Sequence, residues 1–246
     1  MRIFNSEFGH SYDSYSFGYC NYAELERGDR LCDIYQKGYL PYSANLNIKN
    51  IFYMARSARI NIKNFTLNSE NRRIVKRFDG KFEKETIPLS KFNTQGENFI
   101  SFCTEYFSVR HGKKIMPRER LLFLLNSGII SDIAVYKENK IPRAYVFLVS
   151  DKEMTHFWFS FYDISLVYQS LGMYLMIDAA RAALEAQKKY LYIGTVYAEK
   201  ALYKTNFDNL EYWNGSKWAK DIKKLRVRSR SDHIRSINII DEWKES

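Results

Sequence analysis

One stretch in the second half of the chain constrains the fold most strongly, because it reads as a strand, a turn, a long helix and a second strand. Residues 157–162 are an aromatic run of strand length that ends at the turn-prone Asp163. The turn at 169–172 opens a helical run rich in Ala, Leu and Met, residues 173–187. Residues 190–194 form a second short strand pattern. This alternation predicts an α/β protein.

The turn before the long helix is the segment best suited to hold a ligand. A helix that begins at such a turn has unpaired backbone N–H groups there, together with the positive end of its dipole. Phosphate groups bind at helix N-termini of this kind. We therefore expect the chemistry of this chain to lie at and around residues 169–172.

The charge of the chain indicates what it binds. It carries a formal net charge of +10, which favours a polyanionic partner. The alternative is a basic protein whose charge has no such purpose. Its 246 residues suffice for one large domain or two small ones, and 46% hydrophobic residues with only four prolines predict folding throughout.

Cysteines and apolar runs set the expected compartment. Cys20, Cys32 and Cys103 are far apart and show no C-x-x-C spacing, so a disulfide scaffold is not expected. We therefore expect the protein to reside in a reducing cytoplasm. No apolar run has the length of a signal peptide or a membrane span. The four histidines are scattered, and no metal site is expected.

The first half of the chain gives a coarser pattern. Residues 23–37 have helical periodicity, and residues 51–62 read as extended. A short basic helix is expected after an N-cap at Asn68 or Ser69. Two helices are expected between 96 and 128, the second opened by Pro117.

The second half predicts a specific order of elements. Three strand patterns joined by short connections indicate an antiparallel meander: 129–136, 143–149 and 155–162. After the long helix come a strand at 190–195, a short helix at 198–205 and a hairpin around Asn214-Gly215. The order β-β-β-α-β-α-β resembles the GNAT acyltransferase fold.

That resemblance implies a particular arrangement of the molecule. The fold class is α/β (α+β), with a mixed central sheet flanked by helices and a small N-terminal lobe. Residues 155–162 and 190–195 are the expected pair of parallel strands that splay apart to admit a donor, with the long helix crossing between them. The expected parts are a basic lobe at 1–80, the GNAT-like domain at 81–225 and a basic tail at 226–246.

Short motifs add a more specific resemblance. Four occur in the C-terminal half: Phe161-Tyr162-Asp163, Ser170-Leu171-Gly172, Tyr192-Ile193-Gly194 and Tyr203-Lys204-x-x-Phe207. Looser ones lie in the N-terminal half: Phe17-Gly18-Tyr19-Cys20, Gly38-Tyr39-Leu40-Pro41-Tyr42, Ala55-Arg56-Ser57-x-Arg59 and Ser69-x-x-Arg72-Arg73. Together they resemble the aminoacyl-tRNA–protein transferases of the arginyl or leucyl type, which extend protein N-termini. The family's clustered N-terminal cysteines are missing, so the resemblance favours the fold and the tRNA donor over arginine as the transferred residue.

The resemblance implies roles for individual residues. Asp163 and Tyr162 are the catalytic candidates, since a carboxylate near the attacking amine can orient it and accept its proton. The other interpretation of Asp163 is a turn residue or helix cap. Donor-binding candidates are Ser170, Leu171, Gly172, Tyr192, Gly194, Tyr197, Tyr203, Lys204 and Phe207. Among these the tyrosines have the alternative of plain core packing, and Lys204 that of a solvated lysine.

The expected partners follow from the same resemblance. Arg56, Arg59, Arg72 and Arg73 are the candidates for tRNA backbone contacts, although Arg72 and Arg73 also fit the solvated face of a short helix. The expected reaction moves an amino acid from aminoacyl-tRNA to a protein N-terminus, with no cofactor and no membrane. Two alternatives remain: a GNAT N-acyltransferase that uses acetyl-CoA or another acyl-CoA, and an RNA-binding relative without activity.

Overall fold

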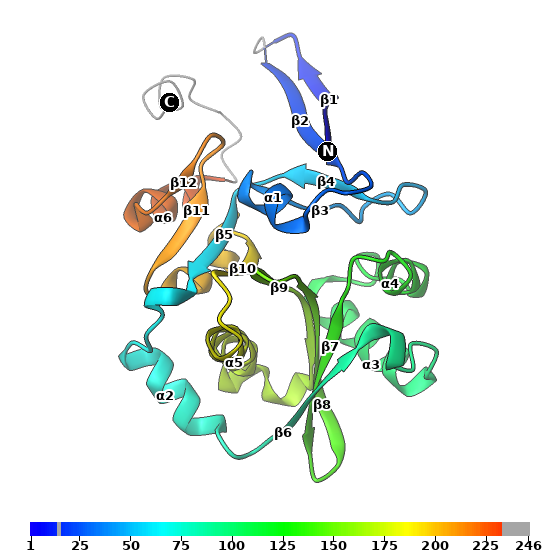
Figure 1. Cartoon of the computed structure of the whole chain (residues 1–246), viewed down its shortest axis with the longest axis vertical. Coiled ribbons are helices and arrows are strands. Elements are labelled where there is room, and N and C mark those ends of the chain that lie inside the picture. Colours follow the sequence, from blue (N-terminus) through cyan, green and yellow to red (C-terminus); the bar gives the residue numbers. More distant parts are fainter. Residues whose placement is uncertain (14–15, 233–246) are drawn as a thin grey trace.

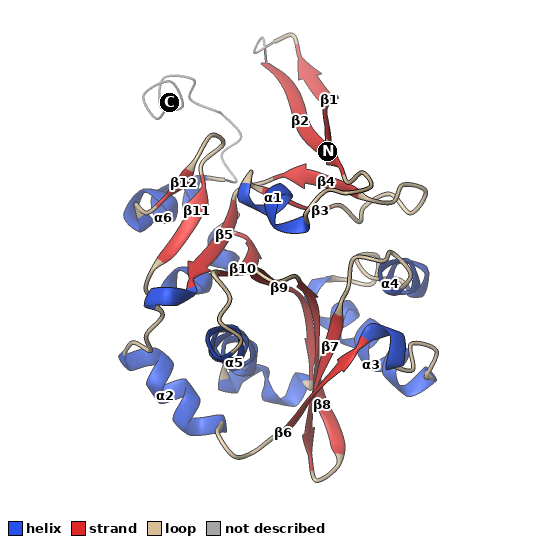
Figure 2. Ribbon diagram, viewed as in Figure 1, coloured by secondary structure: helices blue, strands red, loops and turns tan. Residues whose placement is uncertain are grey.

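The chain folds into a mixed α/β structure with two β-sheets, shown by a computed structural model (Figures 1 and 2). The structure describes residues 1–13 and 16–232. The larger sheet has eight strands in the order β12-β11-β5-β10-β9-β8-β7-β6. The bounds of its strands are β5 (Ser57–Asn61), β6 (Glu83–Pro88), β7 (Asp132–Glu138), β8 (Ile141–Ser150), β9 (Met154–Tyr162), β10 (Tyr190–Thr195), β11 (Leu210–Trp213) and β12 (Trp218–Ala219).

The meander predicted from the sequence is confirmed. β7, β8 and β9 are consecutive antiparallel neighbours, and their buried faces hold aromatic and branched side chains such as Phe147 and Phe161. The predicted hairpin around Asn214-Gly215 is present as β11 and β12. β6, which pairs with β7 at the edge of the sheet, is not predicted by the sequence pattern. Its side chains are almost all exposed, so it lacks the alternating pattern that marks a strand.

The two central strands separate as predicted. β10 runs parallel to β9 over three residue pairs, from Tyr190 opposite Met154 to Tyr192 opposite His156. Beyond this point β9 continues along β8, whereas the end of β10 pairs with β5, where Thr195 lies opposite Ser57. The crossing helix α5 (Leu171–Glu185) packs against both strands. Backbone between the splayed strands is thereby opened to a ligand.

Helices cover both faces of this sheet (Figure 2). α5 lies on one face with α2 (Ser69–Phe78) beside it. The other face of β9 is covered by α3 (Glu97–His111), which packs against α4 (Arg118–Leu125). The predicted starts of α2 and α4 are confirmed. The Asn68 side chain accepts the Asn71 N–H at the start of α2 at 2.9 Å, and Pro117 is the N-cap residue of α4.

The smaller sheet belongs to the N-terminal part and has the order β1-β2-β4-β3. Its bounds are β1 (Arg2–Ser11), β2 (Ser16–Glu24), β3 (Tyr39–Pro41) and β4 (Ile51–Met54). β1 and β2 form a hairpin that projects from the rest of the molecule in Figure 1. The helix predicted at 23–37 is wrong over its first half, because Ala23 and Glu24 complete β2 by pairing with β4. The helix there, α1, covers only Leu31–Gln36.

The expected boundary at residue 80 does not coincide with a structural one. β5, from the first 80 residues, lies inside the larger sheet between β11 and β10. Residues 226–231 of the expected tail belong to α6 (Ile222–Ser231), and residues 233–246 lie outside the described part. No helix within 1–13 and 16–232 has the length and apolar character needed to cross a membrane.

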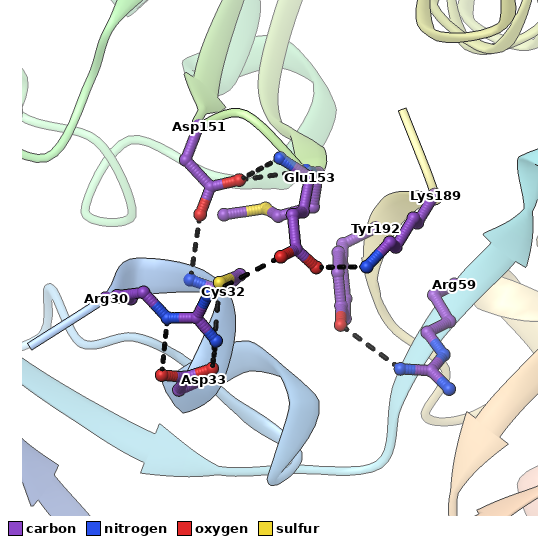
Figure 3. Close-up of polar contacts among 9 residues, drawn as sticks. Arg30, Cys32, Asp33, Arg59, Asp151, Glu153, Lys189 and Tyr192 are labelled. Carbon is purple, nitrogen blue, oxygen red and sulfur yellow. Dashed lines mark hydrogen bonds and ion pairs between the residues drawn. The ribbon is translucent and has the colours of Figure 1, made fainter. Parts of the chain in front are cut away.

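Polar contacts attach the N-terminal lobe to the larger sheet (Figure 3). The Asp151 carboxylate, in the turn after β8, accepts the Cys32 N–H of α1 at 2.9 Å and the Met154 N–H at 2.9 Å. Glu153 pairs with Lys189 at 2.9 Å, just before β10. Glu153 also pairs with Arg30, just before α1, at 3.6 Å. These contacts hold α1 against the turn between β8 and β9, at the end of the sheet where β9 and β10 pair.

Candidate functional site

A cleft of about 1200 Å³ lies where β9 and β10 part. Its walls come from the end of β9, the start of α5, the short 3-10 helix η4 (Glu199–Asn206), the end of α3 and the loop after β3. Its aromatic lining is formed by Tyr42, Tyr53, Tyr106, Phe107, Phe157, Trp158, Phe159, Tyr162, Tyr197 and Tyr203. Four arginines and lysines also line it: Arg110, Arg120, Lys200 and Lys204. No Asp or Glu is among the described residues of its lining, so the cleft is electropositive.

The start of α5 forms one wall, as the sequence predicted. Ser170 and Gly172 both line the cleft, and Ser170 adopts a left-handed conformation with φ 67°. Gly172 lies against the Tyr162 ring: a Cβ added at this position would come within 2.8 Å of the Tyr162 hydroxyl. Only glycine therefore lets the first turn of α5 approach the end of β9 so closely.

Lys204 reaches the cleft from η4. Its ammonium donates to the carbonyl oxygen of Thr195 at 2.9 Å, and it stands against Gly194, whose φ is +81°. Burial lowers the pKa of Lys204 to about 8. The amine thus carries its proton much less firmly than a solvated lysine does.

His156 also lines the cleft, although no sequence pattern marks it as a site residue. It is 1% exposed and occupies the last paired position before the strands separate. Its Nδ1 lies 2.9 Å from the Tyr35 hydroxyl, and its Nε2 has no hydrogen-bond partner among the described residues. Burial, together with the Lys204 charge, lowers the pKa of His156 to about 3. The imidazole is therefore neutral at pH 7.

Three of the predicted donor-binding residues have buried side chains and are not part of the described lining of the cleft. Tyr192 is 1% exposed, and its hydroxyl lies 3.3 Å from the Arg59 guanidinium (Figure 3). Its neighbour Ile193 lines the cleft, whereas Tyr192 is not part of the described lining. Leu171 and Phe207 are buried in the main hydrophobic core. By contrast, Tyr197, Tyr203 and Gly194 do line the cleft.

Asp163 is committed to the turn after β9. Its carboxylate pairs with Arg143 at 2.7 Å and accepts the Ser165 N–H at 2.9 Å and the Ser165 hydroxyl at 2.6 Å. Burial raises the pKa of this carboxyl, but the bonds from Ser165 and Arg143 outweigh it and the net pKa is lowered. Asp163 is not part of the cleft lining, and a carboxylate so stabilised is a weak base. We assign it to the turn.

The predicted arginine patch is not assembled. Arg59 is 6% exposed, pairs with Glu211 at 2.8 Å and stacks between Tyr190 and Trp218. Arg56 lines the neighbouring cavity described below, but its guanidinium binds the Asp232 carboxylate at 2.8 and 2.9 Å.

The remaining two arginines of that prediction, Arg72 and Arg73, are exposed on α2, which packs on α5 outside the cleft lining. The cations that do line the cleft come from α3, α4 and η4. Of these four cations the sequence singled out only Lys204, through the Tyr203-Lys204-x-x-Phe207 motif. Arg110, Arg120 and Lys200 are single residues on three separate elements and form no pattern in the sequence.

A second cavity of about 630 Å³ adjoins the cleft and shares Tyr53 and Tyr197 with it. It lies between the hairpin strand β2 and the β11–β12 turn. The three cysteines are free thiols, and Cys32 and Cys103 are buried. Within 1–13 and 16–232 no group of three His, Cys, Asp or Glu side chains is placed to hold a metal ion.

Comparison with known proteins relates the chain to aminoacyltransferases. The aspartate/glutamate leucyltransferase of Dinoroseobacter shibae is 27% identical over 204 residues, which cover 72% of this chain and 70% of that protein. The aspartate/glutamate leucyltransferase of Cereibacter sphaeroides (strain ATCC 17029 / ATH 2.4.9) is 37% identical over 62 residues, or 24% of this chain and 22% of that protein. No family model matches the chain.

Solved structures resemble the chain only weakly. A DUF2156 domain from Agrobacterium fabrum has a TM-score of 0.44 at 13% identity, over 61% of this chain and 49% of that one. A conserved protein of unknown function from Bacteroides thetaiotaomicron has a TM-score of 0.43 at 16% identity, over 58% and 51%. At these values neither likeness supports a conclusion about fold or activity.

Proposed function

We propose that this protein transfers an amino acid, of the leucyl type named in its relatives, from aminoacyl-tRNA to the N-terminal amine of a protein. The acceptor's first residue is aspartate or glutamate in this proposal. The observation that carries it is the electropositive, aromatic cleft between β9 and β10, which has no carboxylate in its described lining. The splayed parallel strands and crossing helix support a GNAT-like arrangement, in which a donor occupies the gap.

The cleft suits the 3′ end of a charged tRNA. Bases of single-stranded RNA bind by stacking on aromatic side chains, and Tyr197 and Tyr203 are the exposed ones on the η4 side. Arg110 and Lys200 are placed for phosphates, and the first turn of α5 offers its helix N-terminus. The aminoacyl ester would lie deepest, near Lys204 and His156.

The reaction needs positioning and one proton transfer. The acceptor amine attacks the ester carbonyl, a C–N bond forms, the C–O bond to the ribose breaks, and the ribose oxygen leaves as a hydroxyl. An α-amine has a pKa close to 8, which matches that of Lys204 at about 8. In this proposal Lys204 takes the amine's proton and returns it to the ribose oxygen. The Nδ1 of His156 lies 2.9 Å from the Tyr35 hydroxyl. In this proposal the neutral imidazole carries its proton on Nδ1, and its Nε2 accepts a hydrogen bond from the amine.

The test is transfer from charged tRNA. Purified protein is incubated with leucyl-tRNA, with a mixture of other charged tRNAs or with acetyl-CoA, and a peptide beginning with Asp is analysed by mass spectrometry. We expect leucine to be added in the first case, and a Lys204→Arg variant to be at least tenfold slower. Acetylation of the peptide, or tRNA binding without any transfer, would contradict the proposal and favour an acyl-CoA enzyme or an inactive RNA-binding protein.

A further inference from the structure

Arg120 is a charged group of the cleft that the reaction above does not use. It stands in the first turn of α4 and is half-buried against the loop after β3. Its guanidinium donates to the Ser43 hydroxyl at 3.0 Å and to the Ile115 carbonyl oxygen at 2.6 Å. Its Nε is buried and has no hydrogen-bond partner among the described residues.

This guanidinium has no counter-ion in residues 1–13 and 16–232. Both of its hydrogen bonds go to neutral oxygens, whereas Arg118 on the same helix pairs with Glu97 at 2.6 Å. A buried charge without a partner is costly, and burial lowers the pKa of Arg120 from its usual value. An anion that enters the cleft would relieve that cost.

The surroundings of Arg120 fit a carboxylate. Ser43 is 8% exposed, so its hydroxyl is held in place beside the guanidinium. Tyr42 and Tyr53 line the same cleft as Arg120 and Ser43. A guanidinium binds a carboxylate through two parallel N–H bonds, and nearby hydroxyl groups can donate to the remaining lone pairs.

This wall is not the one that the donor uses in the proposed function. Arg110, Lys200 and the first turn of α5 hold the RNA there, whereas Arg120 belongs to the wall built by α4 and the N-terminal lobe. The amine must reach the ester carbonyl from a side that the donor leaves open. An acceptor peptide therefore lies along the lobe, with the side chain of its first residue within reach of this wall.

We propose that Arg120 and Ser43 form a carboxylate-binding subsite that recognises the acidic side chain of the acceptor's first residue. The proposal rests on the proposed function for the identity of the acceptor. Arg120 is a specificity residue in this view, and it takes no part in proton transfer. Tyr42 and Tyr53 complete the subsite by supplying hydroxyl groups.

Two measurements test the subsite. The first is kcat/KM for peptides that begin with Asp or Asn, in the wild type and in Arg120→Gln, Arg120→Lys and Arg118→Gln; the last is the matched control on the same helix. The second is binding of the Asp peptide without any donor, followed by tryptophan fluorescence, since Trp158 lines the cleft. This second measurement does not depend on transfer.

We expect Arg120→Gln to lower kcat/KM for the Asp peptide about a hundredfold and to change the Asn peptide and tRNA affinity less than threefold, because a charged pair is lost. Arg120→Lys should recover part of the loss, and Arg118→Gln should behave as wild type. Equal losses for both peptides, or a loss of tRNA affinity, would overturn the subsite in favour of a donor phosphate contact. If Arg120→Gln does not fold, Arg120→Lys and Ser43→Ala decide, by the same Asp-over-Asn ratio.

Peptide binding separates the two proposals. If no charged tRNA supports transfer but the Asp peptide still binds more tightly than the Asn peptide, and only through Arg120, the proposed function fails and the subsite stands. If transfer occurs and Arg120 has no effect on the Asp-over-Asn ratio, the subsite fails and the proposed function stands.

Discussion

At the scale of single residues, the cleft depends on a lysine whose charge is poorly solvated. Lys204 has a pKa of about 8, below the 10.5 of a solvated lysine, so the unfolded chain binds this proton more tightly than the folded one. The cost of burying the charge is fully present below pH 8, where both states are protonated. It decreases as pH rises from 8 to 10.5, because the folded protein releases its proton first.

The first prediction follows from this dependence of stability on pH. Lys204→Met should be more stable than the wild type at pH 7. Removing the buried charge should add on the order of 2 kcal/mol, from which the free energy of the lost hydrogen bond to Thr195 is subtracted. The difference should shrink toward pH 10. Thermal unfolding of both proteins between pH 6.5 and 10 measures it. A difference that stays constant with pH would mean that Lys204 is solvated in the folded protein.

The second prediction concerns Asp163, whose charge stabilises the folded protein, whereas that of Lys204 destabilises it. Asp163→Asn loses the ion pair to Arg143 and should cost about 1 kcal/mol of stability, while transfer per folded molecule changes less than twofold. The folded pKa of Asp163 is lowered, so its stabilisation is present above about pH 4 and is lost as pH falls below that value. Urea unfolding at pH 7 and pH 3 checks the sign. A large loss of transfer without loss of stability would restore Asp163 as a catalytic residue.

At the scale of elements, the cleft is set by the contact between α5 and the end of β9. Gly172→Ala places a methyl group 2.8 Å from the Tyr162 hydroxyl, so the first turn of α5 or the Tyr162 ring must move. We predict a loss of transfer of at least tenfold and a melting temperature lower by several degrees. Tyr162→Phe in the same chain should recover part of the stability, because it removes the closest atom. Full activity of Gly172→Ala alone would show that the close contact between α5 and the Tyr162 ring is not needed for transfer.

Element order could be predicted from the sequence, but the faces of the elements could not. The aromatic run at 157–162 and the Ala-rich helix identify β9 and α5, and the short links between strands identify the meander. Burial then decides which neighbour in Tyr192-Ile193 meets the cleft, and a linear pattern does not contain that choice. The sequence patterns do not predict β6 and β1, because almost all of their described side chains are exposed and no alternation of apolar and polar residues marks them as strands.

The same limit explains the misplaced residues of the site. The resemblance implies a phosphate contact for Arg59, yet the neighbouring strand places Glu211 directly opposite it in register. His156 was overlooked because it is one polar residue in an apolar strand. What makes it notable is the separation of β9 and β10 immediately after it, which only the pairing of distant segments reveals.

At the scale of the whole molecule, the net charge of +10 comes from cations inside the cleft and from cations outside it. Two exposed cations, Arg110 and Lys200, line the cleft, whereas Arg72 and Arg73 are exposed on α2 outside its lining. Each phosphate contact contributes about one unit to the slope of log affinity against log salt. Arg110→Gln with Lys200→Gln should therefore flatten the slope of tRNA binding by about two units, and Arg72→Gln with Arg73→Gln, which removes the same charge, should leave it within half a unit. Filter binding between 50 and 300 mM KCl measures both. Equal slopes for the two double variants would show that tRNA affinity depends only on the net charge of the protein. That result would contradict binding of the RNA in the cleft.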